Sequence, residues 1–322
     1  MSQALRLPTA ADVEAARANI AGIARRTPLW RLDVDLPDTT IYLKLENLQP
    51  LGSFKIRAGV NAIKCADPAD LADGVMAPSA GNFGQGLAFA ARRMGLPVTI
   101  IAPDGAAKTK SDALEALGAR IIRLPFDDWW RVLISRRLEG VEGMFFHPVA
   151  ESAVVAGNAT IGMELIEDLP EFDTVIAPFG GGGLASGIGS VLRRLKPSAK
   201  VMVVESQAAQ PAGAAFAAGR PVKVSHDQSF VDGMGSATVL DEMWPLIRET
   251  VAGALCVSYA EITAAIRLLA AKHHIIAEGA GAASVAAALS GRAGKGVIVC
   301  IVSGGNIDAS KLAPILAGEE PF

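Results

Sequence analysis

The stretch TVIAPFGGGGLASG at residues 174–187 joins an apolar run, four consecutive glycines and the start of a segment with helical spacing. Continuous apolar runs of this length are typical of strands that are buried on both faces of a parallel sheet. The glycines allow the backbone N–H groups to converge at the amino end of a helix, where the helix dipole favours an anion. The stretch therefore predicts an α/β fold with a phosphate-binding loop after a parallel strand.

The same alternation of apolar runs and helical spacing continues on both sides of this loop. Strands are predicted at residues 42–45, 74–77, 98–102, 120–124, 174–177, 201–205 and 297–302. Helices are predicted at residues 54–65, 83–94, 108–117, 128–138, 152–169, 184–195 and 261–273. We therefore expect two open, mostly parallel twisted sheets flanked by helices. A small domain of residues 74–149 is expected to be inserted into a large domain of residues 1–73 and 150–322.

The composition limits the possible classes of function. The chain has 322 residues, of which 51% are hydrophobic and 20% charged, so a large core is expected and disorder is not. A net charge of −3 without a basic run is not typical of nucleic-acid binding. Cys65, Cys256 and Cys300 are far apart and fit neither a disulfide framework nor a zinc site. The four histidines also lack metal-binding spacing, so no metal is expected.

The sequence also bears on where the protein acts. No uninterrupted apolar stretch approaches the ~18 residues that span a bilayer. The amino end carries one Arg near its start and no apolar signal segment after it. We therefore expect a cytoplasmic protein with neither a membrane nor a nucleic acid as partner.

The glycine loop has two chemical interpretations besides that of a flexible turn. Gly180, Gly182 and Ala185 fit the pattern G-x-G-x-x-A, and Glu205 closes the next predicted strand where a ribose-binding acid is expected. This pattern predicts a dinucleotide-dependent oxidoreductase. The loop fits the phosphate of another cofactor equally well, and on its own it does not distinguish the two.

A second loop, PSAGNFGQG at residues 78–86, follows the strand predicted at residues 74–77. Ser79 and Asn82 are residue types that cap helices, and the free N–H groups at a helix start suit a carboxylate. A capped helix is the simpler interpretation. The glycines at 81 and 84, on either side of Asn82, favour a binding loop instead.

Lys55 lies in the first turn of the helix predicted at residues 54–65. A lysine there opposes the helix dipole, so helix stability does not explain its place. A solvated surface lysine is the simpler interpretation, but an amine between Phe54 and Ile56 could be desolvated, with a lowered pKa that suits a Schiff base. A further segment, SGGN at residues 303–306, follows the last predicted strand and opens at the same sheet edge; its simpler interpretation is a plain turn.

Together these motifs resemble the pyridoxal-phosphate enzymes of fold type II (tryptophan synthase β-like), and among them the threonine/serine dehydratase and serine racemase family. The resemblance covers nearly the whole chain. Its carriers are TPL at 27–29, KLEN at 44–47, GSFK at 52–55, residues 79–85, the glycines at 180–183, DG at 232–233, EGAG at 278–281 and SGGN at 303–306. Each motif is short, and their order and placement make the resemblance specific.

The resemblance implies a role for each matched residue. Lys55 resembles the catalytic lysine that forms the Schiff base with pyridoxal phosphate. Asn82 resembles the partner of the ring hydroxyl, and Ser303 that of the pyridine nitrogen. The residues that match cofactor-binding positions are Phe54, Lys55, Asn82, Gly180, Gly181, Gly182, Gly183, Leu184 and Ser303. Those that match the substrate loop are Ser79, Ala80, Gly81, Asn82 and Phe83.

The implied activity is an ammonia-lyase (dehydratase) that converts a small β-hydroxy amino acid to a 2-oxo acid and ammonia. A hydroxyl at Ser303 bonds a neutral pyridine nitrogen, which weakens the ring as an electron sink and favours prompt loss of a β-leaving group. The substrate could be threonine, serine or a relative such as 3-hydroxyaspartate, phenylserine or an intermediate of hydroxyectoine breakdown. The resemblance also implies a homodimer.

Three positions depart from the family pattern. Ala80 replaces the second serine of serine racemase, so racemase activity is not expected. Phe83 replaces the histidine of many members, which could reshape the substrate pocket. Glu205 fits the divalent-metal site of the racemase branch, but Pro211 replaces its Asp, so no divalent ion is expected. The alternatives are the dinucleotide-dependent oxidoreductase and a non-catalytic binding protein with the same fold.

Overall fold

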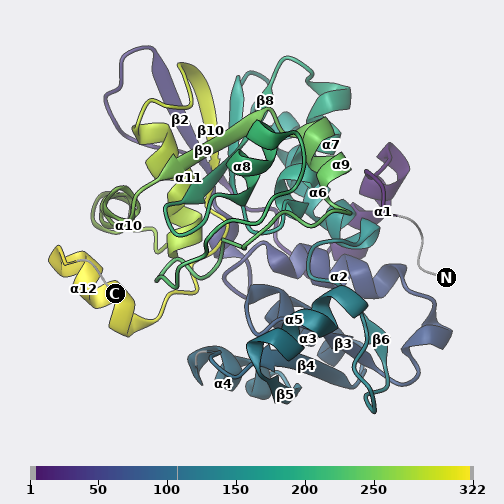
Figure 1. Ribbon diagram of the computed structural model, residues 1–322. Coiled ribbons are helices and arrows are strands. Elements are labelled where there is room, and N and C mark those ends of the chain that lie inside the picture. The colour runs from purple at the N-terminus through teal and green to yellow at the C-terminus, as the bar shows by residue number, and fades with distance from the viewer. Residues whose placement is uncertain (1–4, 107, 320–322) are drawn as a thin grey trace.

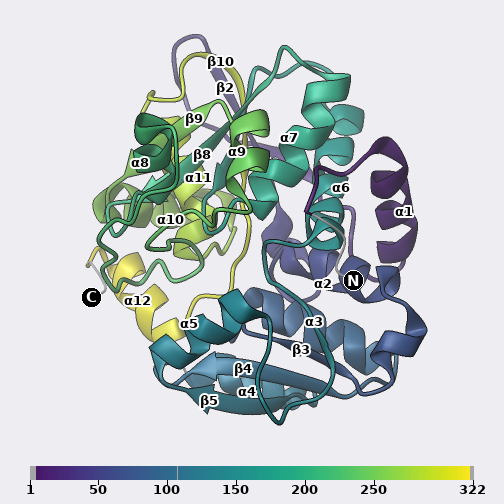
Figure 2. The same ribbon diagram turned by 45° about the vertical axis from the view of Figure 1, so that its right-hand side comes forward.

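Two sheets carry the architecture of the protein, which this computed structural model describes for residues 5–106 and 108–319 (Figure 1, Figure 2). The larger sheet has six strands in the order β1-β2-β10-β7-β8-β9, and the smaller has four in the order β5-β4-β3-β6. Every neighbouring pair is parallel except β1 and β2. The prediction of two open, mostly parallel sheets is confirmed.

The elements have the following bounds. The strands are β1 (Leu29–Arg31), β2 (Thr39–Lys44), β3 (Val75–Ala77), β4 (Val98–Pro103), β5 (Arg120–Leu124), β6 (Met144–Phe145), β7 (Thr174–Pro178), β8 (Lys200–Ser206), β9 (Gly253–Val257) and β10 (Gly296–Ile301). The helices are α1 (Ala10–Ile20), α2 (Lys55–Cys65), α3 (Asn82–Arg93), α4 (Lys108–Ala116), α5 (Phe126–Ser135), α6 (Ser152–Asp168), α7 (Gly183–Leu195), α8 (Pro211–Ala218), α9 (Trp244–Thr250), α10 (Tyr259–His273), α11 (Gly279–Leu289) and α12 (Ala309–Ala317). Two 3₁₀ helices, η1 (Glu46–Leu48) and η2 (Pro68–Leu71), complete the set.

All seven predicted strands and all seven predicted helices occur; the strand at residues 120–124 has the predicted bounds, and the other elements have shifted ends. The helix predicted at residues 128–138 is α5, which ends at Ser135 because Arg136 adopts a left-handed φ of 57°. Strands β1, β6 and β9 were not predicted, since each lies at the edge of a sheet and has no continuous buried run. Helix α11 was missed because it is small and apolar on every side and has no amphipathic period.

The order of the strands along the chain fits an insertion. All four strands of the smaller sheet lie between residues 75 and 145, and the larger sheet takes its strands from both sides of this segment. Figure 2 shows the smaller sheet below the larger one, with α2 at the level between them. The exact domain boundaries stay a prediction. None of the described helices is long and apolar enough to cross a bilayer.

Helix α2 packs against α3 and α6, and glycines allow all three helices to approach closely. A Cβ atom on Gly59 of α2 would lie 2.7 Å from the backbone of Gly86 in α3. A Cβ atom on Gly157 of α6 would lie 2.6 Å from the carbonyl oxygen of Arg57 in α2. Because no side chain fits at such distances, α2 and its first residue, Lys55, have little freedom to shift.

A buried cluster of charges fixes α2 further. The guanidinium of Arg57, which is 0% exposed, donates two hydrogen bonds to Glu46 and two to Glu164, at 2.6–2.9 Å. Lys44 in β2 contacts the Glu164 carboxylate at 2.7 Å. Burial acts to raise the pKa of Glu46, but the Arg57 guanidinium outweighs it and holds this pKa below its usual range. The cluster therefore joins β2, η1, α2 and α6 through buried charges.

We expect Arg57→Met to lower the free energy of unfolding by about 3–5 kcal/mol, because it removes the guanidinium that binds two buried carboxylates at once. Denaturant titration followed by circular dichroism measures this loss. Arg248→Met, on the exposed side of α9, is the matched control and is expected to change stability by less than about 0.5 kcal/mol. Equal stabilities for the two variants would contradict the role given to the cluster.

Candidate active site

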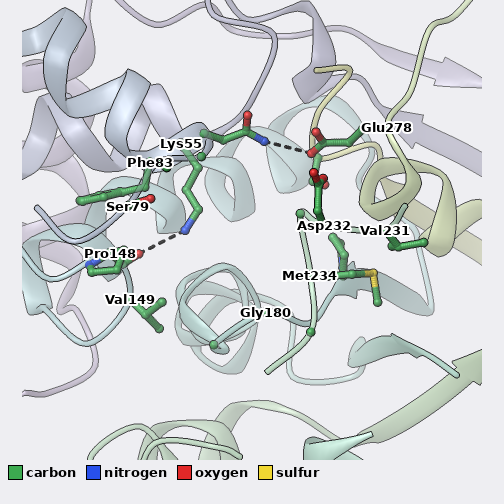
Figure 3. Close-up of a pocket in the computed structure, with 18 of the residues that line it drawn as sticks. Lys55, Ser79, Phe83, Pro148, Val149, Gly180, Val231, Asp232, Met234 and Glu278 are labelled. Atoms are coloured by element: carbon green, nitrogen blue, oxygen red, sulfur yellow. Dashed lines mark hydrogen bonds between the residues drawn. The ribbon is translucent and has the colours of Figure 1, made fainter. Parts of the chain in front are cut away.

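A pocket of about 580 Å³ lies where loops from both sheets meet, at the carboxyl ends of β3, β4, β6, β7 and β10. Figure 3 shows side chains from helix starts and from the loops that follow the strands around this pocket. The structure brings together all the residues predicted to bind cofactor or substrate: Phe54, Lys55, Ser79, Ala80, Gly81, Asn82, Phe83, Gly180, Gly181, Gly182, Gly183, Leu184 and Ser303. These segments are up to about 250 residues apart in the sequence, and the parallel strands explain why they meet, since such strands end at the same sheet edge.

Lys55 is the first residue of α2, and its backbone N–H donates to the hydroxyl of Ser53, 3.3 Å away. Its amine donates to the carbonyl of Pro148, 3.1 Å away, as Figure 3 shows. The amine also lies 5.1 Å and 5.6 Å from the ring centroids of Phe54 and Phe83. Burial lowers the pKa of Lys55 to about 8, and no described carboxylate forms an ion pair with it. This amine therefore loses its proton far more readily than a surface lysine.

The glycine loop crosses the pocket opposite Lys55 and leads into α7. Gly182 has a φ of 88°, in the left-handed region. A Cβ atom on Gly181 would lie 2.7 Å from both methyl groups of Val149, and one on Gly182 would lie 2.6 Å from Ile247. Within the described chain, no group accepts a hydrogen bond from the backbone N–H groups of Gly181, Gly182 and Leu184. The loop is thus a cradle of free donors at a helix start, which suits an anion.

The loop at residues 78–86 differs from the prediction in how its polar side chains are used. Neither the Ser79 nor the Asn82 side chain bonds a backbone N–H group of α3 within the described residues, and the N-cap is Gly81. The capping interpretation is therefore wrong. Asn82 instead donates from Nδ2 to Glu278 at 3.0 Å and accepts at Oδ1 from Asn306 at 2.9 Å. These partners come from the far end of the chain, so no local pattern could have predicted them.

Comparison with known proteins places this chain in a family. A model of the family described as "pyridoxal-phosphate dependent enzyme" matches residues 20–304. The chain belongs to this family. The cradle of free N–H groups and the deprotonable amine of Lys55 fit a cofactor that carries a phosphate and reacts as an aldehyde.

The relatives give the same family and carry specific names. The chain is 36% identical to "L-threonine ammonia-lyase" of Thermotoga maritima, over 96% of this chain and 78% of that one. It is 34% identical to "L-threonine dehydratase catabolic TdcB" of Staphylococcus aureus, over 95% and 91% of the two chains. Among solved structures, maize serine racemase matches with a TM-score of 0.88 at 29% identity, over 98% of both chains.

Glu205 does not contribute to the pocket of this protein. Its carboxylate accepts hydrogen bonds from the N–H groups of Ala212 at 2.6 Å and Gly213 at 2.9 Å, in the first turn of α8. Both oxygens are engaged there, so they are not available for a ribose, and the comparisons give no support to a dinucleotide-dependent oxidoreductase. Among the described residues, no three His, Cys, Asp or Glu side chains are grouped to hold a metal.

Two polar residues near the pocket were not given roles from the sequence. Glu278 is 5% exposed at the start of α11, and burial together with nearby Asp232 raises its pKa to about 7. His147 is 1% exposed, and its Nδ1 accepts from the N–H groups of Val149 at 3.1 Å and Ala150 at 2.8 Å. Burial, Arg136 and Lys55 lower the pKa of His147 to about 3, so it stays neutral and keeps this acceptor. Metal-binding spacing in the sequence does not reveal a histidine that accepts hydrogen bonds from backbone N–H groups.

We expect His147→Ala to lower the free energy of unfolding by about 1–3 kcal/mol, because it leaves two N–H groups without an acceptor. The same change should weaken cofactor binding, since this turn holds Pro148 against Lys55 and Val149 against the glycine loop. His147→Asn retains an acceptor near the position of Nδ1 and should recover most of both losses. Unfolding curves and cofactor titration measure them, and a His147→Ala variant as stable as the wild type would contradict this role.

Proposed function

We propose that the protein is a pyridoxal-phosphate-dependent ammonia-lyase that converts a small β-hydroxy amino acid, with threonine as the first candidate, to a 2-oxo acid and ammonia. The observation that carries the proposal is one pocket that holds both a readily deprotonated lysine and a set of backbone donors that have no acceptor among the described residues. The names of the relatives from Thermotoga maritima and Staphylococcus aureus support the reaction and the substrate.

Each part of the pocket has a binding task in this proposal. The N–H groups of residues 180–184 would hold the cofactor phosphate, and the Asn82 amide and the Ser303 hydroxyl would bind the ring oxygen and the ring nitrogen. The loop at residues 79–83 receives the substrate carboxylate at the start of α3. When bound, the cofactor supplies an electron-withdrawing ring that makes the Cα proton of the amino acid acidic.

Lys55 then acts as the general base. Its uncharged amine removes the Cα proton, and the ammonium so formed returns that proton to the β-hydroxyl, which leaves as water. The enamine that remains reacts with water to give the 2-oxo acid and ammonia. The rings of Phe54 and Phe83 on either side limit the access of solvent to the amine, which keeps its pKa low. Ala80, which is 9% exposed at the pocket, has no group that could return a proton to the other face of Cα. This asymmetry favours elimination over racemisation.

Two expectations about the setting of the enzyme remain predictions, namely a homodimer and a cytoplasmic location. Trp30, Leu48 and Ile276 are 43–51% exposed beside a second pocket of about 500 Å³. Exposed apolar side chains that gather in this way are typical of a surface that another chain covers. This feature supports the homodimer.

Lys55→Ala is expected to reduce the formation of 2-oxobutanoate from L-threonine by at least about 10³-fold, because the variant loses both its base and its attachment point. The visible absorption band of the covalently attached cofactor should disappear as well. Lys64→Ala, in the last turn of the same helix, is the control and should keep both. Full turnover by Lys55→Ala would exclude the proposed mechanism.

The pKa of Lys55 predicts how the cofactor-free protein takes up pyridoxal phosphate. Only the uncharged amine attacks an aldehyde, and with a pKa of about 8 its share rises with pH until this value is passed. The initial uptake rate, followed by absorption, should therefore rise from about pH 6 to about pH 8 and then level off. A rate that continues to rise beyond about pH 9 would indicate an ordinary lysine and contradict the lowered pKa.

A further inference from the structure

The amide of Asn82 has both of its ends engaged. Its Nδ2 donates to Glu278 Oε1 at 3.0 Å, and its Oδ1 accepts from Asn306 Nδ2 at 2.9 Å. Figure 3 shows the contact with Glu278 at the edge of the pocket, on the side away from the Lys55 amine. Asn82 also lines the pocket, so the second N–H of Nδ2 is the donor that it has left to offer there.

The direction of this chain of hydrogen bonds is set by a backbone group. Nδ2 of Asn306 also donates to the carbonyl of Leu51, 2.8 Å away, and a carbonyl oxygen can only accept. Asn306 therefore cannot turn its amide round without losing that bond. The N–H donor of Asn306 therefore requires the Oδ1 of Asn82 to face it. If the Asn82 amide were reversed, two donors would face each other at Asn306 and two acceptors would face each other at Glu278.

The fold makes room for Glu278 in this position. A Cβ atom on Gly304 would lie 2.5 Å from Glu278 Oε1, and one on Gly233 would lie 3.0 Å from the same oxygen. The backbone N–H of Glu278 donates to the carbonyl of Gly304 at 3.0 Å, which ties the start of α11 to the loop after β10. Although Glu278 is the N-cap of α11, its side chain makes no cap and turns to Asn82 instead. Two loops thus leave space for a carboxylate whose one hydrogen-bond partner among the described residues is Asn82.

We propose that Glu278 and Asn306 are positioning residues that fix the Asn82 amide with its nitrogen toward the ring oxygen of the cofactor. This inference rests on the proposed function. A fixed N–H donor at that place stabilises the ring oxygen as an anion and disfavours its protonated form, which would need an acceptor. Leu51, Asn306 and Glu278 would then influence the ionisation of the ring oxygen, although of these residues and Asn82 only Asn82 would touch the cofactor.

The test reverses the direction of the chain in the full-length protein loaded with pyridoxal phosphate. In the double variant Glu278→Gln/Asn306→Asp, residue 278 gains a donor and residue 306 becomes an acceptor. Asn82 should then turn its Oδ1 toward the pocket and favour the protonated ring oxygen. The readout is the ratio of the visible band, from the ionised form, to the near-ultraviolet band, from the protonated form. We expect this ratio to fall by about tenfold or more, as the loss of one charge-assisted hydrogen bond predicts.

Three further variants complete the design. Glu278→Gln alone keeps an acceptor for Asn82 and should retain the wild-type ratio. Glu278→Gln/Asn306→Leu releases the amide without reversing it, should give an intermediate ratio, and decides the matter if the reversed variant does not fold. Glu205→Gln is the matched control, a buried glutamate that caps α8 outside the pocket, and should leave the ratio unchanged.

The outcomes separate this inference from the proposed function. Wild-type protein that neither takes up pyridoxal phosphate nor forms a 2-oxo acid would refute the proposed function. Wild-type protein that does both, together with unchanged band ratios in both double variants, would overturn the inference alone. A wild-type spectrum dominated by the near-ultraviolet band would overturn it too. The expected series, with the wild-type ratio highest and the reversed variant lowest, would establish it.

Discussion

Arg57 carries a positive charge where no solvent reaches it. The arrangement around the pocket depends on the carboxylates that pair with this charge. Glu46 comes from η1, just before α2, and Glu164 comes from α6 and lies 107 residues after Arg57 in the chain, so two separate elements must satisfy the guanidinium. A buried ion pair of this kind adds little net stability, but any misplacement of a partner is severely penalised. The cluster therefore selects one register for α2 against its neighbours. Since Lys55 lies two residues before Arg57, that register fixes the place of the amine.

The pocket is built from helix starts as well as from strand ends. Helices α2, α3 and α7 begin there, at Lys55, Asn82 and Gly183, and α11 begins beside them. Each start contributes partial positive charge from its free N–H groups. A cofactor phosphate and a substrate carboxylate complement this field, whereas a protonated lysine is opposed by it. The same arrangement that binds anions thus assists the loss of a proton from Lys55.

The sequence was informative where function depends on local backbone geometry. The apolar run at β7 and the four glycines after it predict a strand, a turn and a helix from the chemistry of adjacent residues, and this segment occurs as expected. Helix α11 was not predicted because it is buried on all sides, and the edge strands were not predicted because neither of their faces is fully buried. In both cases the sequence has no hydrophobic period to detect. The roles of Glu278 and His147 were not predicted from the sequence for another reason. One acts on an amide 196 residues away and the other on backbone N–H groups, and neither relation leaves a spacing in the sequence.

Two ionisable groups in the pocket have pKa values moved toward neutrality by the same cause. Burial lowers that of Lys55 to about 8 and raises that of Glu278 to about 7. A direct ion pair between them would have had the opposite effect, since each charge would stabilise the other and the amine would remain protonated. In the structure, Lys55 turns to the carbonyl of Pro148 while the Asn82 amide occupies Glu278. Each group thus has a neutral hydrogen-bond partner of its own, and we expect the lysine, which is not held in an ion pair, to act as a base near neutral pH.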